Sequence, residues 1–311
     1  MLRKVAIAQS IFFTAAAILV LSSLSLMIFI GGRGLSVFGK ISPAEFFFGT
    51  EWNQNTPVFG VLPLLYGSIL TALVTLLISA PLAILVAVFM VEVAPAPIRR
   101  VMRTTVELFA SLPSVIYGLL GLTIVVPWVR DIFHAGLGKG ILAAALVLVF
   151  MTQPTMVTIT EDALRRLPDS LREAARGIGA TRWQMIWGVL LPAARQGIIT
   201  AIILGMGRAV GETMAVQMVI GNITARIPKD LVTGATTMPA AIVTQLPEAT
   251  SAAHKDALIM VGFLLLCITF ILISLVRLTS GDSKKQPRRK ITRPVTTGSG
   301  APEITRQGSE A

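Results

Sequence analysis

The sequence is short of charge, cysteine and histidine, and each shortage argues against a class of protein. Only 14% of its 311 residues are charged, against roughly a quarter in an average soluble domain. The single cysteine, Cys267, cannot form an internal disulfide, and the apolar run around it indicates a buried, unreactive thiol. The two histidines, His134 and His254, fall in different connecting loops without a cysteine or acidic cluster around them. We therefore expect neither a disulfide framework nor a metal site.

The sequence also lacks a phosphate-binding loop for ATP. The segment HAGLGKG at 134–140 resembles one superficially. The motif needs glycine at 133, where Phe133 stands, and serine or threonine at 140, where Gly140 stands. We expect that this chain hydrolyses no ATP and holds no cofactor.

Long apolar runs dominate what the sequence does contain. Hydrophobic residues make up 54% of the chain, and its mean hydropathy is +0.76. A helix needs about 20 apolar residues to cross a hydrocarbon core of about 30 Å. Six segments are long enough: 5–30, 61–91, 105–129, 140–160, 197–220 and 257–276. The first exceeds the apolar core of a signal peptide, so we interpret it as a retained helix. The sequence predicts an all-α membrane domain over residues 1–280.

The basic residues orient this domain. An even number of spans places both termini on one side of the membrane. If that side is the cytoplasm, most of the 27 lysines and arginines lie there, notably at 99–103, at 165–195 and from 277 onward. Cytoplasmic loops carry such an excess. The net charge of +11 therefore reflects topology, and we expect no nucleic-acid partner.

The last segment, 281–311, is rich in Ser, Thr, Gly, Pro and basic residues and has no apolar face. This composition predicts a disordered cytoplasmic tail. Its basic cluster at 284–290 is most simply a solvated flank, with contact to anionic lipid headgroups as the alternative.

Several predicted spans contain proline, which deletes a helix hydrogen bond and kinks the helix. They are Pro63, Pro81, Pro113 and Pro154. The segment ASLPSVIYGLLG at 110–121 adds small and hydroxyl residues to this pattern. It suits a helix bent around a central path, and it equally suits ordinary close helix packing.

Two charged residues, Arg208 and Glu212, interrupt the fifth apolar segment. An arginine within the membrane costs at least about 2.5–3.5 kcal/mol on insertion scales. On a continuous helix the two side chains share a face and can form an ion pair. Gly207 and Gly211 would form a small strip beside that pair, where another helix approaches closely. A static salt bridge and a site for an oxyanion both fit these residues.

The longest loop between spans, 161–195, predicts a short helix that faces a partner. It would begin near Pro168, with Ser170 and Glu173 as a capping box, and end near Gly177 or Gly179. Its alanines, Ala174 and Ala175, would offer a small surface that fits a groove on another protein.

The segment EAARGIGATRWQMIWGVLLP resembles the EAA loop of ABC-importer permeases. The matching positions are Glu173, Ala174, Ala175, Gly179, Leu191 and Pro192, while Val189 replaces the usual isoleucine. The resemblance implies the type I ABC importer permease fold, with six transmembrane helices. It also implies that a cytoplasmic coupling helix between helices 4 and 5 docks on an ATP-binding subunit.

The segments GRAVGETMAV and SLPSVIYGLLGL resemble permeases of the bacterial phosphate-specific ABC importers, the PstC type more closely than its PstA-type sister. The resemblance covers residues from about 60 to 278. It implies that Arg208 and Glu212 line the phosphate path, in the inner membrane of a bacterium.

The same resemblance implies several partners. They are a second phosphate permease subunit, two ATP-binding subunits that hold ATP and Mg, an outer phosphate-binding protein, membrane lipid and a regulatory sensor system. The sister permease and a sulfate or molybdate permease remain alternatives. A passive anion channel or an ion-coupled carrier would have no use for the EAA loop.

Overall fold

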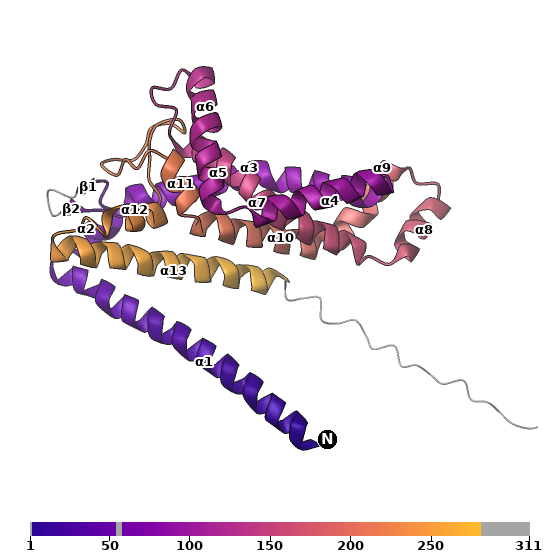
Figure 1. Cartoon of the computed structure of the whole chain (residues 1–311), viewed down its shortest axis with the longest axis horizontal. Coiled ribbons are helices and arrows are strands. Elements are labelled where there is room, and N and C mark those ends of the chain that lie inside the picture. The colour runs from indigo at the N-terminus through magenta and orange to yellow at the C-terminus, as the bar shows by residue number, and fades with distance from the viewer. Residues whose placement is uncertain (1, 54–57, 281–311) are drawn as a thin grey trace, which may run out of the picture. The chain divides into compact units, whose positions relative to one another are not determined.

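The computed structural model describes residues 2–53 and 58–280, and the side chains within 11–53 and 58–274 (Figure 1). By its internal contacts the chain divides into Met1–Ser280 and Gly281–Ala311. The second unit lies outside the described residues, so the disordered tail at 281–311 and its lipid contact stay predictions.

The described residues are almost entirely helical, and six helical stretches have the length and composition to cross a membrane. These are Ile11–Gly39, Leu62–Val93, Ser114–Phe133, Ile141–Arg165, Arg182–Gly211 and Ala252–Ser274. The prediction of an all-α membrane protein with six spans is confirmed. The strands found among the described residues, β1 (Trp52–Asn53) and β2 (Val58–Phe59), form one short antiparallel ladder.

Five long helices contain about half of the described residues, and shorter ones connect them (Figure 1). The long helices are α1 (Leu2–Leu35), α3 (Leu62–Val88), α7 (Ile141–Arg165), α10 (Leu191–Gly211) and α13 (Ala252–Ser280). The shorter α-helices are α2 (Pro43–Phe48), α4 (Ala96–Ser111), α5 (Ser114–Leu120), α6 (Val126–Phe133), α8 (Asp169–Gly177), α9 (Arg182–Met185), α11 (Met214–Val219) and α12 (Met238–Gln245). A 3₁₀ turn, η1 (Ser36–Gly39), follows α1, and π-helical turns η2 (Phe89–Val93), η3 (Gly121–Val125) and η4 (Ile186–Leu190) extend or join the others.

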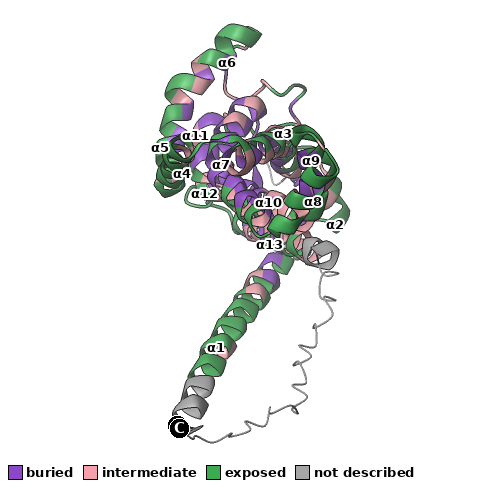
Figure 2. Ribbon diagram, turned by 90° about the vertical axis from the view of Figure 1, so that its right-hand side faces the viewer, coloured by how far each residue is buried: buried purple, intermediate pink, exposed green. Residues whose placement is uncertain are grey.

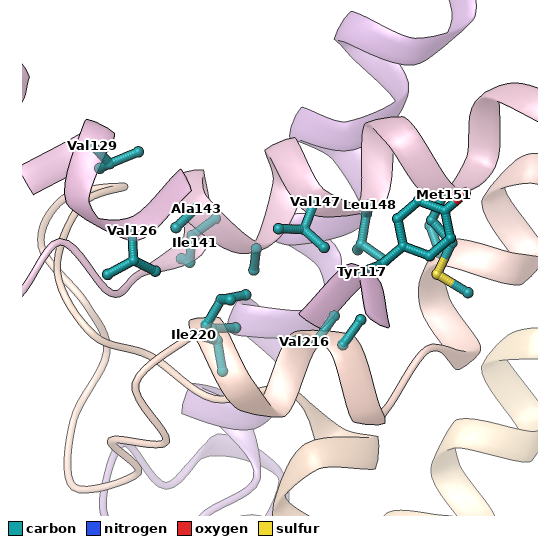
Figure 3. Packing of buried hydrophobic residues seen from close by; sticks show 14 of the residues in the cluster. Tyr117, Val126, Val129, Ile141, Ala143, Val147, Leu148, Met151, Val216 and Ile220 are labelled. Carbon is teal, nitrogen blue, oxygen red and sulfur yellow. The ribbon is translucent and has the colours of Figure 1, made fainter. Parts of the chain in front are cut away.

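Helix α7 is the centre of the packing. It lies against α3 and α10, and its apolar run is the most extensively buried of the six (Figure 2). One core cluster joins α7 to α5 and α11 through residues such as Tyr117, Leu148 and Val216 (Figure 3). By contrast, the described apolar side chains of α1 are largely exposed (Figure 2). In a membrane this surface faces lipid or another subunit.

The third predicted span, 105–129, is not one helix. Helix α4 ends at Ser111, Leu112 and Pro113 are extended, and a second helical run continues from Ser114 to Phe133. Proline disfavours helical geometry at the preceding residue, which explains the break. Figure 1 shows α5 and α6 turning away from the direction of α4. The Tyr117 hydroxyl donates to the Phe109 carbonyl across the break, at 2.6 Å.

The fifth predicted span, 197–220, is wrong at both ends. The helical run begins at Arg182, through α9 and η4, because a helix can continue beyond the hydrocarbon core with charged residues on it. It ends at Gly211, and α11 starts after a break at Glu212 and Thr213.

Two smaller expectations also need correction. Pro63 lies in the first turn of α3, where proline removes no helix hydrogen bond, whereas Pro81 and Pro154 are interior as predicted. His254 is not in a loop but buried in α13, with its Nε2 at 3.2 Å from the Gln245 Oε1. Within the described residues, no group of three His, Cys, Asp or Glu side chains is placed to hold a metal ion.

Candidate functional site: an intramembrane arginine and a coupling helix

Arg208 lies in the last turn of α10 and points to α7. Its Nη1 donates to the Thr155 Oγ1 at 3.1 Å, and within the described residues this is the guanidinium's one hydrogen bond. The side chain is half-buried. Its remaining N–H groups are therefore available to a ligand.

Glu212 lies just beyond the end of α10, with φ −73° and ψ 128°. Its Oε1 accepts from the Ala215 amide at 3.2 Å, so the carboxylate caps the start of α11. The predicted ion pair with Arg208 is wrong, because the helix that would bring the two side chains onto one face ends at Gly211. The ion pairs of the described residues do not join them.

The expected small-residue strip at Gly207 and Gly211 is also wrong for contacts within this chain. A Cβ built on either glycine meets no described atom within 4 Å. The strip that packs lies on another face of α10: Gly197 touches Ala163, and Gly205 touches Met156, both on α7. The face that carries Gly207 and Gly211 is left open beside the helix break. Non-helical backbone at membrane depth is tolerated where protein or a water-filled cavity surrounds it.

A buried seam of hydroxyl and amide groups between α3 and α7 was not predicted. The Ser79 and Thr152 hydroxyls lie 2.9 Å apart, and the Gln153 Nε2 donates to the Ser79 carbonyl at 3.0 Å. The sequence held one signal, since Thr71, Thr75 and Ser79 recur every fourth residue on α3. The seam fixes α7 against α3 next to the turn that carries Thr155.

The short helix predicted in the loop at 161–195 exists as α8, between α7 and the run that ends in α10. Its N-cap is Pro168 and has no capping side chain, so the Ser170–Glu173 box is wrong. A capping box occurs instead at Thr181 and Gln184, at the start of α9. Glu173 and Ala174 are exposed, as docking requires. Ala175 is not part of that surface, since it is 3% exposed and packs inward with the cluster of Met185 and Leu190.

Gly179 has a specific role in the turn that ends α8. It has φ +78°, a left-handed conformation that favours glycine. Its amide donates to the Arg176 carbonyl at 3.0 Å, and the Ala180 amide donates to the Ala175 carbonyl at 3.0 Å. These two bonds are those of a Schellman turn. The glycine of the EAA pattern therefore closes the helix that carries Glu173.

The final two positions of the pattern lie apart from this surface. Leu191 and Pro192 begin α10, and Leu191 packs in the cluster below Ala175. The structure thus brings Glu173, Ala174 and Gly179 together on one projection, and leaves Leu191 and Pro192 to start the next helix.

An ion pair that the sequence did not reveal anchors α8. Arg172 contacts the Glu92 Oε1 at the end of the second span, with Nη2 at 2.9 Å and Nε at 3.1 Å. The two side chains are 13% and 7% exposed. The guanidinium also donates to the Leu164 and Leu167 carbonyls at 3.1 and 3.2 Å and to Asp169 at 3.2 Å. Arg172 therefore ties α8 to η2 and to the end of α7.

Comparisons with known proteins agree with this architecture. The chain is 40% identical over 274 residues to the probable ABC transporter permease protein YqgH of Bacillus subtilis, covering 86% of this chain and 88% of the relative. It is 37% identical over 283 residues to the phosphate transport system permease protein PstC of Xylella fastidiosa, covering 85% and 86%. A bacterial ABC transporter involved in alginate import superposes with a TM-score of 0.61 at 17% identity, covering 88% of this chain and 96% of that one. Residues 79–281 match the family described as the binding-protein-dependent transport system inner membrane component. On this match, and on the identity to ABC permeases along most of its length, the chain belongs to the inner-membrane components of binding-protein-dependent transport systems.

Proposed function

We propose that this chain forms one half of the translocation path of an ATP-driven importer of inorganic phosphate. The observation that carries the proposal is the Arg208 guanidinium, most of whose N–H donors have no partner among the described residues, beside a helix break within a membrane bundle. The 37% identity to a phosphate permease supports phosphate as the transported anion.

Arginine suits this task because its planar donors match the oxygens of a phosphate group, often two at a time. A transport site must also release its ligand. Glu212, at the break that follows α10, would contribute to release by placing a negative charge along the path, which opposes tight binding of an anion. Its bond to Ala215 also holds α11 in place beside the path.

The remaining subunits supply the energy and the substrate. A second permease completes the path, and its surface covers the open face at Gly207 and Gly211. Two ATP-binding subunits, which hold ATP and Mg, dock below through Glu173, Ala174 and the Gly179 turn. An outer phosphate-binding protein delivers the anion. Both termini are cytoplasmic, as the basic residues at 99–103 and 165–195 indicate. This chain itself holds no cofactor and catalyses no covalent step.

The central test is phosphate uptake by cells that carry Arg208→Gln in the complete transporter. We expect uptake to fall at least tenfold at normal membrane expression, since a neutral amide provides fewer donors and no charge. Arg226→Gln is the matched control, because Arg226 is exposed in the loop between α11 and α12. Normal uptake by Arg208→Gln would refute the proposed role. Competition by sulfate or molybdate as strong as that by phosphate would assign the chain to a different oxyanion.

A further inference from the structure

The partner that holds Arg208 is a neutral hydroxyl and not a carboxylate. Thr155 on α7 accepts from the Arg208 Nη1 at 3.1 Å, and the carboxylate of Glu212 is engaged with Ala215. A carboxylate partner would neutralise the guanidinium and compete with an incoming anion. A hydroxyl fixes the position of the flexible arginine side chain and leaves its charge in place.

The Thr155 hydroxyl also has a hydrogen to donate. The neighbouring threonines of α7 use theirs within the helix: Thr152 donates to the Leu148 carbonyl at 2.9 Å, and Thr158 to the Pro154 carbonyl at 2.8 Å. For Thr155, the guanidinium is the one hydrogen-bond partner among the described residues. A threonine hydroxyl has one donor hydrogen and two acceptor lone pairs. While one lone pair accepts from Arg208, the O–H remains free to donate.

The backbone that carries Thr155 is held independently of this hydroxyl. Thr152 and Gln153, on the preceding turn, bond to Ser79 of α3. Gly205 on α10 packs against Met156, the residue after Thr155. Removing the hydroxyl alone therefore leaves the α3–α7–α10 packing intact.

We propose that Thr155 is a second substrate contact of the translocation path. Its oxygen accepts from Arg208, and its hydrogen donates to an oxygen of the same phosphate that the guanidinium binds. The two side chains form one donor surface, built from α7 and α10. This inference rests on the proposed function of Arg208.

The test compares variants of the full transporter, reconstituted in proteoliposomes with its ATP-binding subunits and supplied with phosphate-loaded binding protein. Thr155→Val keeps the shape and removes the hydroxyl, and Thr155→Ser restores it. Thr155→Ala is a second variant without the hydroxyl, in case valine disturbs assembly. Thr158→Val is the matched control, because that hydroxyl bonds within its own helix. The maximal uptake rate and the half-saturating concentration of loaded binding protein are measured separately.

We expect Thr155→Val and Thr155→Ala to lower the maximal rate about tenfold, the effect of one hydrogen bond to a charged group. Half-saturation by the binding protein should not change, since docking occurs elsewhere. Thr155→Ser and Thr158→Val should transport normally. In an Arg208→Gln background, Thr155→Val should cause no further loss.

Each other outcome is decisive. Normal transport by Thr155→Val, together with loss in Arg208→Gln, overturns this inference and leaves the proposed function standing. Loss in Thr155→Ser equal to that in Thr155→Val also overturns it, because shape and not the hydroxyl would then matter. Normal transport by Arg208→Gln overturns the proposed function itself.

Discussion

Breaking the ion pair between Glu92 and Arg172 should loosen helix α8 without unfolding the membrane bundle. Both side chains are largely buried, at 7% and 13% exposed. Removing one partner of a buried pair typically costs about 3–5 kcal/mol, because the other charge is left without compensation. The pair lies at the end of the second span, so the cost falls on the attachment of α8.

The two single variants should destabilise the attachment of α8 by different amounts. In Glu92→Gln the Arg172 guanidinium keeps its hydrogen bonds to the carbonyls of Leu164 and Leu167 and to the carboxylate of Asp169. We therefore expect a loss of about 2 kcal/mol, below the usual range for a broken buried pair. In Arg172→Gln all of these bonds are lost together, and we expect the full range of about 3–5 kcal/mol.

Amide hydrogen exchange of α8 in the purified transporter measures this loss directly, because local opening sets the exchange rate. Each 1.4 kcal/mol is a factor of about ten. Exchange should accelerate roughly 30-fold in Glu92→Gln and more than about 100-fold in Arg172→Gln. Arg166→Gln is the control, since Arg166 is exposed at the end of α7.

Loosening of α8 should also weaken the coupling between ATP hydrolysis and phosphate import. If α8 transmits the movement of the ATP-binding subunits to η2 and α7, more ATP is hydrolysed for each phosphate imported in both variants. Unchanged α8 exchange in Arg172→Gln would refute the assignment of this pair as the anchor. Faster exchange with an unchanged ratio of ATP to phosphate would refute its role in coupling.

Two further predictions concern the docking surface and the helix packing. Glu173→Arg combined with Gly179→Asp should abolish co-purification of the ATP-binding subunits. The control Glu248→Arg should not, since Glu248 is an exposed acidic residue on another loop. Co-purification of these subunits with the double variant would contradict docking through α8. Gly197→Ala should destabilise the chain by about 1–3 kcal/mol, since its Cβ would overlap that of Ala163 on α7. In the chain purified without a partner permease, Gly207→Ala should leave the melting temperature unchanged or raised, since the added Cβ meets open space within this chain. The reverse order of melting temperatures would contradict the packing of α10 on α7.

Hydropathy was sufficient to predict that six helical stretches could span a membrane, but not the bounds of the third and fifth, and the loop sequence was sufficient to predict the short helix α8. Long apolar runs leave few alternatives to a membrane helix, and Gly179 marks the end of α8 because its turn needs a left-handed residue. The spacing of the EAA pattern located the exposed Glu173 correctly. It did not reveal that Ala175 packs inward, because which face of a short helix is buried depends on the clusters around Met185 and Leu190.

The interior of the fifth span could not be predicted by the same means. Arg208 and Glu212 have the spacing of a helical ion pair, and no proline separates them. The helix nevertheless ends at Gly211, where the Glu212 carboxylate instead caps α11. The Glu212 carboxylate can either pair with Arg208 on a continuous helix or accept from the start of α11 after a break. The packing of α11 on α5 and α7 favours the second arrangement. Likewise, Thr155 lies 53 residues before Arg208, so only the fold brings them together.

Arg172 on α8 and Arg208 on α10 show how the same kind of side chain can serve two tasks. Arg172 is surrounded by two carboxylates and two carbonyls, so its charge is compensated and its position is fixed. Arg208 lies within a membrane-spanning helical run, where charge is costly, yet within the described residues its one hydrogen bond is to a hydroxyl. If Arg208 served only to hold helices together, compensation by a carboxylate would lower its cost, and Glu212 is four residues away. That this carboxylate caps α11 instead leaves a positive charge that an anion can neutralise as it passes. The cost of burying the uncompensated arginine is then offset when the anion binds, which couples occupancy of the path to the stability of the bundle around it.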